Sequence, residues 1–479
     1  MRQRIVASFW SSWALAAALC LPAGAAELPK YQALDLGALG GKYSSASSIN
    51  AAGQVTGSAQ TPNGSWHAFR FTPGSPMEDL GTLGGLSSGG TAINDAGQVT
   101  GRATNADGMG RAFRATPGQP MEDLGTLGGD ESWGFAINDA GQVLGEADIA
   151  HRVWHAVRAT PGQPMEDLGT LGGDESWGFA INDAGQATGY ARTADGRARA
   201  FLATPGQPME DLGTLGGEES LGRDINAVGQ VTGWAQGLGY SHAFRATPGQ
   251  PMEDLGTVGE VSSSGEAIND AGQVAGVLEG PDAAFLYSDG SMKAIGTFGG
   301  PNTAVYDINE LGHVVGMSEA VRGCEETRRD YRQPPSCLEW WGRAFVYRDG
   351  TMTNLGTLGG IHSVGFAIND VGQVAGAYYD QINYEDEEPH AVLWTPISLL
   401  YSRLLDDVTG VGPGKSLAQK VRIATAYYEA DDKQATCAML KAFNNQVKAQ
   451  SGKKVSVDLA RQLMAEARAI SGAIRCGSN

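Results

Sequence analysis

The sequence of 479 residues contains only 5 cysteines, and after residue 26 it has no apolar run long enough to cross a bilayer. We therefore do not expect an integral membrane protein. Basic charge is also scarce, because 34 Lys and Arg stand against 53 Asp and Glu, a formal net charge of -19. Nucleic-acid binding depends on clustered Lys and Arg, so no nucleic-acid partner is expected, whereas neutral sugars and cationic surfaces are compatible partners.

The first 26 residues are typical of a secretory signal peptide. Arg2 and Arg4 supply the positive start, residues 9–21 the apolar run, and residues 23–26 a small-residue cleavage site. We expect a secreted protein, either extracellular or periplasmic.

Four cysteines follow this segment. An even number in an exported chain favours disulfides over metal-binding or catalytic thiols. Their proximity in the sequence predicts the pairs Cys324–Cys337 and Cys437–Cys476.

What the sequence has in abundance is repetition, together with 69 glycines. The words "TLGGDESWGFAINDAGQ" occur twice, at residues 126–142 and 170–186. The Ile-Asn dipeptide marks eight copies, spaced by 44 residues four times and then by 43, 40 and 60. A period in this range predicts a solenoid or a propeller, because one unit cannot bury its own faces. The eight anchors are Asn50, Asn94, Asn138, Asn182, Asn226, Asn269, Asn309 and Asn369.

Each repeat contains four short segments of strand character, as in "WGFAIN", "GQVLGEA", "WHAVRA" and "MEDLG" of residues 133–168. Asn138 to Gly141 has the chemistry of a type I turn with a Gly bulge, and Pro161-Gly162 that of a type II turn. The Ile-Asn strand carries Gly and Ala, so we place it at the crowded centre and "MEDLG" at the rim.

The two ends of the array complement each other. A lone rim strand at residues 31–37 precedes the first inner strand, and the last repeat stops after its third strand at residues 390–396. Pairing these segments would close the ring and remove the open sheet edge. We predict an all-β eight-bladed β-propeller closed by its N- and C-terminal strands and followed by a small α-helical bundle. The expected domains are residues 1–26 (signal peptide), 27–396 (propeller) and 397–479 (helical domain).

The repeat resembles the HAF extracellular repeat family, named for a His-Ala-Phe triplet that stands here at residues 67–69 and 242–244. The words "DLGTLGG" and "IND-GQV" match as well, across residues 31–396. At other copies the first residue of the triplet departs, as at Arg111, Arg199 and Arg343. The resemblance implies a secreted bacterial-type protein and brings no assigned chemistry.

After residue 396 glycine becomes rare and helix formers take over. We predict helices over 398–405, 417–429, 431–450 and 457–474, with an apolar stripe on each of the last two. Residues 437–470 look like the FIMAH domain, a small helical module of exported bacterial proteins. That resemblance implies an accessory role in attachment or assembly, including self-association through this domain.

Two groups of residues are candidates for ligand binding, on the face that carries the variable loops. In the first, carboxylates lie beside indoles, a combination that suits stacking and hydrogen bonding of a sugar; the alternative is that the indoles only fill space between blades. The second is the basic and aromatic insertion of residues 317–342, whose alternative is an inert loop. The candidates are Asp130, Glu131, Trp133, Asp174, Glu175 and Trp177 in the first group, and Arg328, Arg329, Tyr331, Trp340 and Trp341 in the second.

We expect no metal and no other cofactor. Oxygen-rich loops would suit Ca²⁺, but no calcium-loop spacing is present. His67, His155, His242 and His390 share one repeat position with Arg residues, which a metal site would not tolerate. This position instead predicts a cation paired with the acidic rim strand.

The candidate acids recur with the repeat, and no G-x-S-x-G, H-E-x-x-H or Walker-type stretch occurs. We therefore favour a secreted binding or scaffold protein for an extracellular glycan or protein over an enzyme. The alternatives are an extracellular polysaccharide hydrolase or lyase that uses face carboxylates, and a structural protein of the cell surface or matrix.

Overall fold

The computed structural model describes residues 28–150, 153–259, 261–280, 284–321, 340–383, 386–412 and 415–477. The predicted signal peptide and the predicted Cys324–Cys337 pair lie outside these ranges. The described chain divides into two compact units, residues 30–406 and residues 28–29 with 407–477. Each unit is described by itself.

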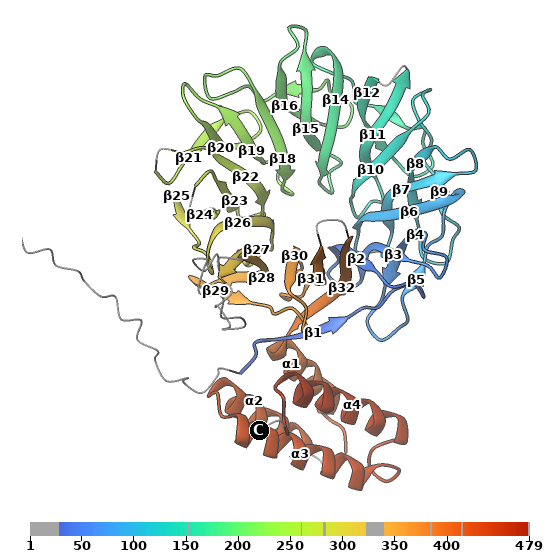
Figure 1. Ribbon diagram of the computed structural model, residues 1–479, viewed down its shortest axis with the longest axis vertical. Helices are drawn as coiled ribbons and strands as arrows, with labels where there is room; N and C mark the ends of the chain where they lie inside the picture. Colours follow the sequence, from blue (N-terminus) through green and yellow to red (C-terminus); the bar gives the residue numbers. More distant parts are fainter. Residues whose placement is uncertain are drawn as a thin grey trace, which may run out of the picture. The chain divides into compact units, whose positions relative to one another are not determined.

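The first unit is an eight-bladed β-propeller, as the repeat predicts. Figure 1 shows its eight sheets arranged around a central channel, each with four strands. In seven blades the four strands follow one another in sequence from the centre to the rim.

The strands of the first four blades are as follows. Blade 1 has β2 (Ser44–Ile49), β3 (Val55–Gln60), β4 (Trp66–Phe71) and β5 (Glu78–Asp79); blade 2 has β6 (Gly84–Ile93), β7 (Val99–Asn105), β8 (Gly110–Ala115) and β9 (Glu122–Asp123). Blade 3 has β10 (Ser132–Ile137), β11 (Val143–Ala150), β12 (Val153–Ala159) and β13 (Glu166–Asp167); blade 4 has β14 (Gly172–Ile181), β15 (Ala187–Thr193), β16 (Ala198–Ala203) and β17 (Glu210–Asp211).

The remaining blades continue the same order. Blade 5 has β18 (Ser220–Ile225), β19 (Val231–Gln236), β20 (Ser241–Ala246) and β21 (Glu253–Gly256); blade 6 has β22 (Ser263–Ile268), β23 (Val274–Leu278), β24 (Ala284–Ser288) and β25 (Ser291–Ala294). Blade 7 has β26 (Gly299–Ile308), β27 (Val314–Val321), β28 (Trp340–Arg348) and β29 (Thr351–Asn354); blade 8 has β30 (His362–Ile368), β31 (Val374–Asn383), β32 (Asp386–Pro396) and β1 (Tyr31–Asp35).

Blade 8 is closed by the two ends of the array, as predicted. Strand β1 pairs antiparallel with β32, and Tyr31 lies opposite Pro396 while Asp35 lies opposite Val392. The rim strand of this blade therefore comes from the start of the chain, and β32 has no free edge.

A turn repeated in every blade fixes the inner strands to one another. At the end of β10, the Gly141 amide donates to the Asn138 carbonyl over 2.9 Å, and Gly141 has a φ of 74°, which glycine adopts at no steric cost. The Asn138 side-chain amide donates to the Asn182 carbonyl of the next blade over 2.9 Å. All eight Asn anchors make this bond, and the last one runs from Asn369 to the Asn50 carbonyl over 3.1 Å, so the ring of hydrogen bonds closes on itself.

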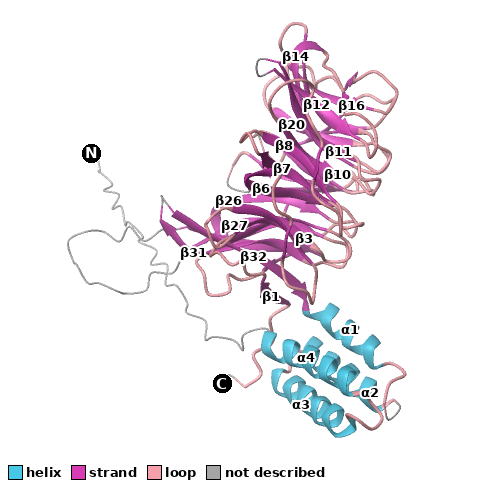
Figure 2. Ribbon diagram, turned by 90° about the vertical axis from the view of Figure 1, so that its right-hand side faces the viewer, coloured by secondary structure: helices cyan, strands magenta, loops and turns pink. Residues whose placement is uncertain are grey.

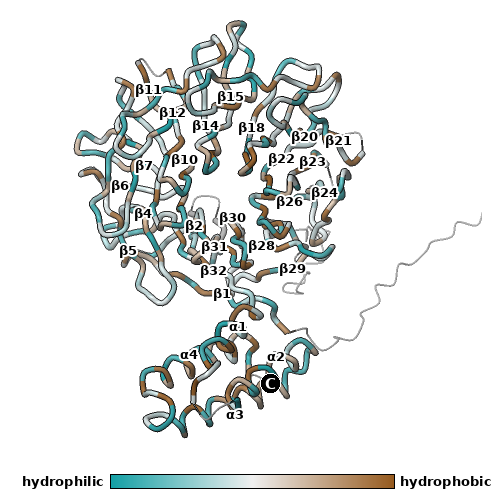
Figure 3. Tube along the Cα trace, turned by 180° about the vertical axis from the view of Figure 1, so that it is seen from behind, coloured by the Kyte–Doolittle hydropathy of each residue, from teal (hydrophilic) through white to brown (hydrophobic). Residues whose placement is uncertain are grey.

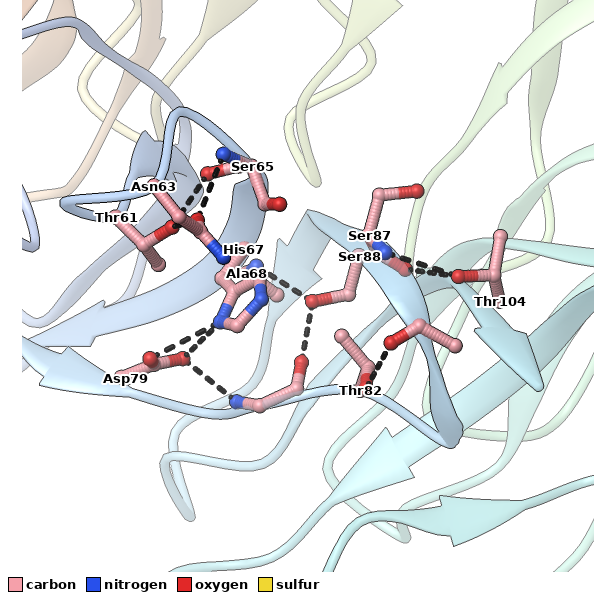
Figure 4. A network of polar contacts seen from close by, with 12 residues as sticks. Thr61, Asn63, Ser65, His67, Ala68, Asp79, Thr82, Ser87, Ser88 and Thr104 are labelled. Atoms are coloured by element: carbon pink, nitrogen blue, oxygen red, sulfur yellow. Dashed lines mark hydrogen bonds and ion pairs between the residues drawn. The ribbon is translucent and has the colours of Figure 1, made fainter. Parts of the chain in front are cut away.

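Adjacent blades are also joined by a serine that the sequence reading overlooked. Ser88 at the start of blade 2 accepts from the Ala68 amide of blade 1 over 2.8 Å and donates to the Gly81 carbonyl, as Figure 4 shows. Serines at the same repeat position make the same amide bond at six further interfaces, including Ser44 with Ala391 across the closure. The residue after each such Ala is buried between blades; it is Phe in five of the seven cases, for example Phe69, and Val at Val157 and Val392. The His-Ala-Phe triplet is thus mainly a packing device.

Helices follow β32 where the apolar periodicity predicts them, and Figure 2 separates them in cyan from the magenta strands. Residues 397–406, most of the first helix, belong to the first unit, and the helices after it form the second. Helix α1 (Ile397–Val408) follows β32 directly, and α2 (Ser416–Glu429), α3 (Lys433–Gln450) and α4 (Val457–Ala473) follow in turn. Leu440, Phe443 and Leu463 are buried, and brown and teal positions alternate along α3 and α4 in Figure 3. The predicted Cys437–Cys476 disulfide is present. None of the helices in the described ranges is both long and apolar enough to cross a membrane.

Candidate ligand-binding face

The inner strands run between two faces of the ring. We call the face with the Asn-x-x-Gly turns the turn face, and the face with the loops that lead into the inner strands the loop face. The channel opens at the turn face into a cavity of 420 Å³ lined by the Ile-Asn dipeptides and their neighbours. The residue after each Asn anchor is acidic in six of the eight blades, namely Asp95, Asp139, Asp183, Asp270, Glu310 and Asp370.

These carboxylates support the ring. The Ala51 amide donates to Asp95 over 2.8 Å and the Asp95 amide to Asp139 over 2.9 Å, and four further links of this kind follow around the channel. In the part of the chain that the structure describes, no three His, Cys, Asp or Glu side chains are placed to hold a metal ion. The acidic ring therefore has an evident structural role.

Two further carboxylates lie in the channel wall where other blades carry Ala or Ser. Asp224 accepts from the amides of Ile225 and Ile268, and Asp307 accepts from those of Ile308 and Ile368, each over 2.8 Å. Burial raises the pKa of Asp224 to about 6 and that of Asp307 to about 7. Each carboxylate bridges two blades, so both act in cohesion.

The first predicted group lies on the loop face, where Arg102 of blade 2 contacts two of its residues. The Arg102 guanidinium lies 4.7 Å from the centroid of the Trp133 ring and donates to Glu131 over 2.7 Å. Trp133 is 37% exposed, so about a third of this large side chain is open to solvent. Arg102 thus holds the indole through a cation–π contact, the Phe135 ring lies 6.2 Å away between centroids, and part of the indole faces solvent. Asp130 beside it is exposed.

The equivalent residues of blade 4 are arranged differently. Glu175 accepts from Arg192 of its own blade over 2.6 Å, and Trp177 stacks on Tyr190 with centroids 6.2 Å apart. Trp177 is half-buried, and Asp174 is exposed. The two indoles therefore differ, because Trp133 is partly exposed while Trp177 is largely a packing residue.

Glu146 is the residue of this face that the sequence reading missed. It lies on β11 directly opposite Trp133, its side chain is 4% exposed, and its Oε2 atom has no hydrogen-bond partner. Burial, together with the nearby Glu175 carboxylate, raises the pKa of Glu146 to about 7. In the preceding interface the same position holds Arg102, which neutralises Glu131. Between blades 3 and 4, the acidic side chains of Glu146 and Glu175 lie near each other instead.

A signal for Glu146 was present in the sequence. Each second strand contains a Gly, and the residue after it differs in every blade although its surroundings repeat. These residues are Ser58, Arg102, Glu146, Tyr190, Trp234, Val277, Met317 and Ala377. Because the surrounding residues repeat, a variable side chain at this position gives each blade different chemistry there. We refer to these eight residues as the variable row.

The second predicted group is only partly described. Arg328, Arg329 and Tyr331 lie outside the described residues. Trp340 begins β28, and Trp341 follows it opposite Ala320, where it is half-buried. The predicted pairing with the rim strand is present in three blades, where His67, His155 and His242 each contact the rim Asp over 2.9 Å, and in a fourth Arg111 lies 3.9 Å from Asp123. Figure 4 shows the first of these pairs, His67 with Asp79.

Neither a protein-family model nor a curated protein matches the sequence. Solved structures do match. A structure of YCF48 bound to D1 peptide is 11% identical, with 77% of this chain and 99% of that chain covered and a TM-score of 0.36. The BP39L lectin from Burkholderia pseudomallei is 10% identical, with 69% and 98% covered and a TM-score of 0.36. The gluconolactonase XC5397 from Xanthomonas campestris is 11% identical, with 56% and 90% covered and a TM-score of 0.27.

Proposed function

We propose that this propeller is an exported binding module that recognises an extracellular glycan at the loop face, with Trp133 as the stacking platform. The observation that carries the proposal is the Arg102–Trp133–Glu131 arrangement, which holds a partly exposed indole in a fixed orientation. A preorganised aromatic loses little entropy when a ligand stacks on it, and the exposed Asp130 next to it offers acceptors to sugar hydroxyls. Export is supported by the N-terminal segment and by the Cys437–Cys476 disulfide.

The test is a glycan array with the full-length protein, followed by calorimetric titration of the best ligand. Trp133→Ala is expected to weaken binding about tenfold or more, as loss of a central aromatic anchor does. Tyr427→Ala is the matched control, since Tyr427 is 39% exposed but lies on α2 of the other unit. Equal binding by the wild type and Trp133→Ala would refute the proposal.

A second function, hydrolysis of a bound polysaccharide, is favoured by Glu146. Glycosidases use two carboxyl groups whose environments hold one protonated and the other ionised near neutral pH. The pKa of Glu146 is raised to about 7, while Glu175 is held by Arg192. In this mechanism Glu146 would donate its proton to the leaving oxygen, and Glu175 would take a proton from the attacking water.

Turnover separates the two functions. If the protein only binds, no reducing ends appear from any glycan that it retains, and Glu146→Gln binds as the wild type does. Release of reducing ends by the wild type, abolished in Glu146→Gln with binding intact, would establish the hydrolase instead.

A further inference from the structure

The helical unit contains a groove of 450 Å³ between α3 and α4, in the size range of small-molecule sites. Its walls carry Lys441 and Asn444 from α3 and Arg468 and Ser471 from α4, and the Cys437–Cys476 disulfide lies at one end. The bond joins the first half of α3 to the chain after α4. The two walls are therefore held at a fixed separation.

The basic side chains of this groove have no acidic partner among the described residues. Lys441 and Arg468 are both exposed, and neither forms an ion pair within the described residues. They stand on opposite walls, so an anionic group between them would interact with both. The surroundings reinforce the effect, because residues 397–479 hold 12 Lys and Arg against 7 Asp and Glu in a protein of net charge -19.

The groove also offers polar groups that suit a hydroxylated ligand. The Oδ1 atom of Asn444 is buried and has no hydrogen-bond partner. A buried acceptor without a partner is costly, and a hydroxyl donor from a ligand would relieve that cost. Asn445 and Ser471 line the same groove and can donate as well as accept.

We propose that this groove binds an acidic saccharide, whose anionic group lies between Lys441 and Arg468 and whose hydroxyl donates to Asn444. The site is separate from the loop face of the propeller and would give the protein a second, electrostatic attachment to a polyuronate or a similar acidic polymer. Two sites on one chain would raise the overall affinity for a surface that presents both ligands.

The test measures binding of the full-length protein to immobilised polygalacturonate at low and moderate salt. Dextran serves as the neutral saccharide and polyglutamate as the carboxylate polymer without hydroxyls. The double variant Lys441→Gln/Arg468→Gln is expected to lose about tenfold or more in affinity. The matched control Lys453→Gln/Lys454→Gln removes the same charge from the turn between α3 and α4 and is expected to change the affinity less than twofold.

Asn444→Ala provides the second arm, and it keeps the charge of the groove unchanged. It is expected to weaken binding of polygalacturonate but not of polyglutamate, because only the saccharide has hydroxyls to donate. Equal losses in the two double variants, equal binding of dextran, or no binding of polygalacturonate by the wild type would each overturn the proposal. Trp133→Ala is expected to leave this binding intact, so failure of the loop-face proposal is distinguishable from failure of this one.

Discussion

Replacing Glu146 by Gln should change how the stability of the propeller depends on pH. Below the ordinary Glu pKa of 4.5 the carboxyl is neutral in both the folded and the unfolded chain. Between that pH and about 7 the unfolded chain ionises while the folded chain stays protonated. The folded state therefore binds more protons and loses stability as pH rises, by about 1.4 kcal/mol per pH unit. The total loss by pH 8 is about 3 kcal/mol.

Gln keeps the shape of the protonated acid and cannot ionise. At pH 4 we expect Glu146→Gln and the wild type to unfold at the same temperature. At pH 8 the variant should be more stable by about 3 kcal/mol. With an unfolding entropy of roughly 2.1 cal/mol/K per residue, the 30–406 unit unfolds with about 0.8 kcal/mol/K, so the expected rise in Tm is about 4 °C.

The assay is thermal unfolding followed by circular dichroism from pH 4 to pH 8. Asp224 and Asp307 titrate in the same pH range and contribute equally to the stability of both proteins. Their contributions therefore cancel when the variant is compared with the wild type at each pH. Glu279→Gln removes a carboxylate from an exposed position and should follow the wild type throughout. A difference between Glu146→Gln and the wild type that stays constant with pH, or a variant less stable at pH 8, would refute the reasoning.

Two further perturbations address the joints of the ring. Ser132→Ala leaves the buried Ala112 amide without its acceptor and should lower the free energy of unfolding by about 1–3 kcal/mol. The control Ser75→Ala lies in an exposed turn and should change it very little. Equal melting temperatures of the two variants would contradict the role given to Ser132. Deletion of residues 31–35 exposes the edge of β32 and should produce oligomers in light scattering at concentrations where the wild type is monomeric. A deleted chain that stays monomeric and melts like the wild type would show that closure does not depend on β1.

The blade number, the inner strand and the closure could all be predicted because the same physical requirement recurs in every copy. Each inner strand needs small residues, and each turn needs Asn at its start and Gly at positive φ, so these letters repeat at a fixed period. The serine of the Ser88 position repeats in seven of the eight copies, with Thr303 in the other. It was overlooked because its partner, the Ala68 amide, belongs to another blade and is invisible in the sequence of a single unit.

The candidate site was harder to predict, because it depends on contacts between blades that do not repeat. Glu131 and Glu175 have identical sequence surroundings, yet one is neutralised by Arg102 of the preceding blade and the other by Arg192 of its own. The difference arises from the variable row, where Glu146 replaces an arginine. The repeat in the sequence predicts which positions lie at the interfaces between blades. The contacts at each interface depend on the two side chains that stand there, and these differ from blade to blade.

The pairing of β1 with β32 also sets an order of events during synthesis. Every other strand of the propeller pairs with its neighbour in sequence, so each blade can form as soon as its own residues are available. The partner of Tyr31 is Pro396, at the far end of the array. The first strand to be made must therefore wait, unpaired, until the last one emerges, and contacts of such long range form slowly. Throughout that interval β1 remains without its partner, which makes late closure the step most exposed to misassembly.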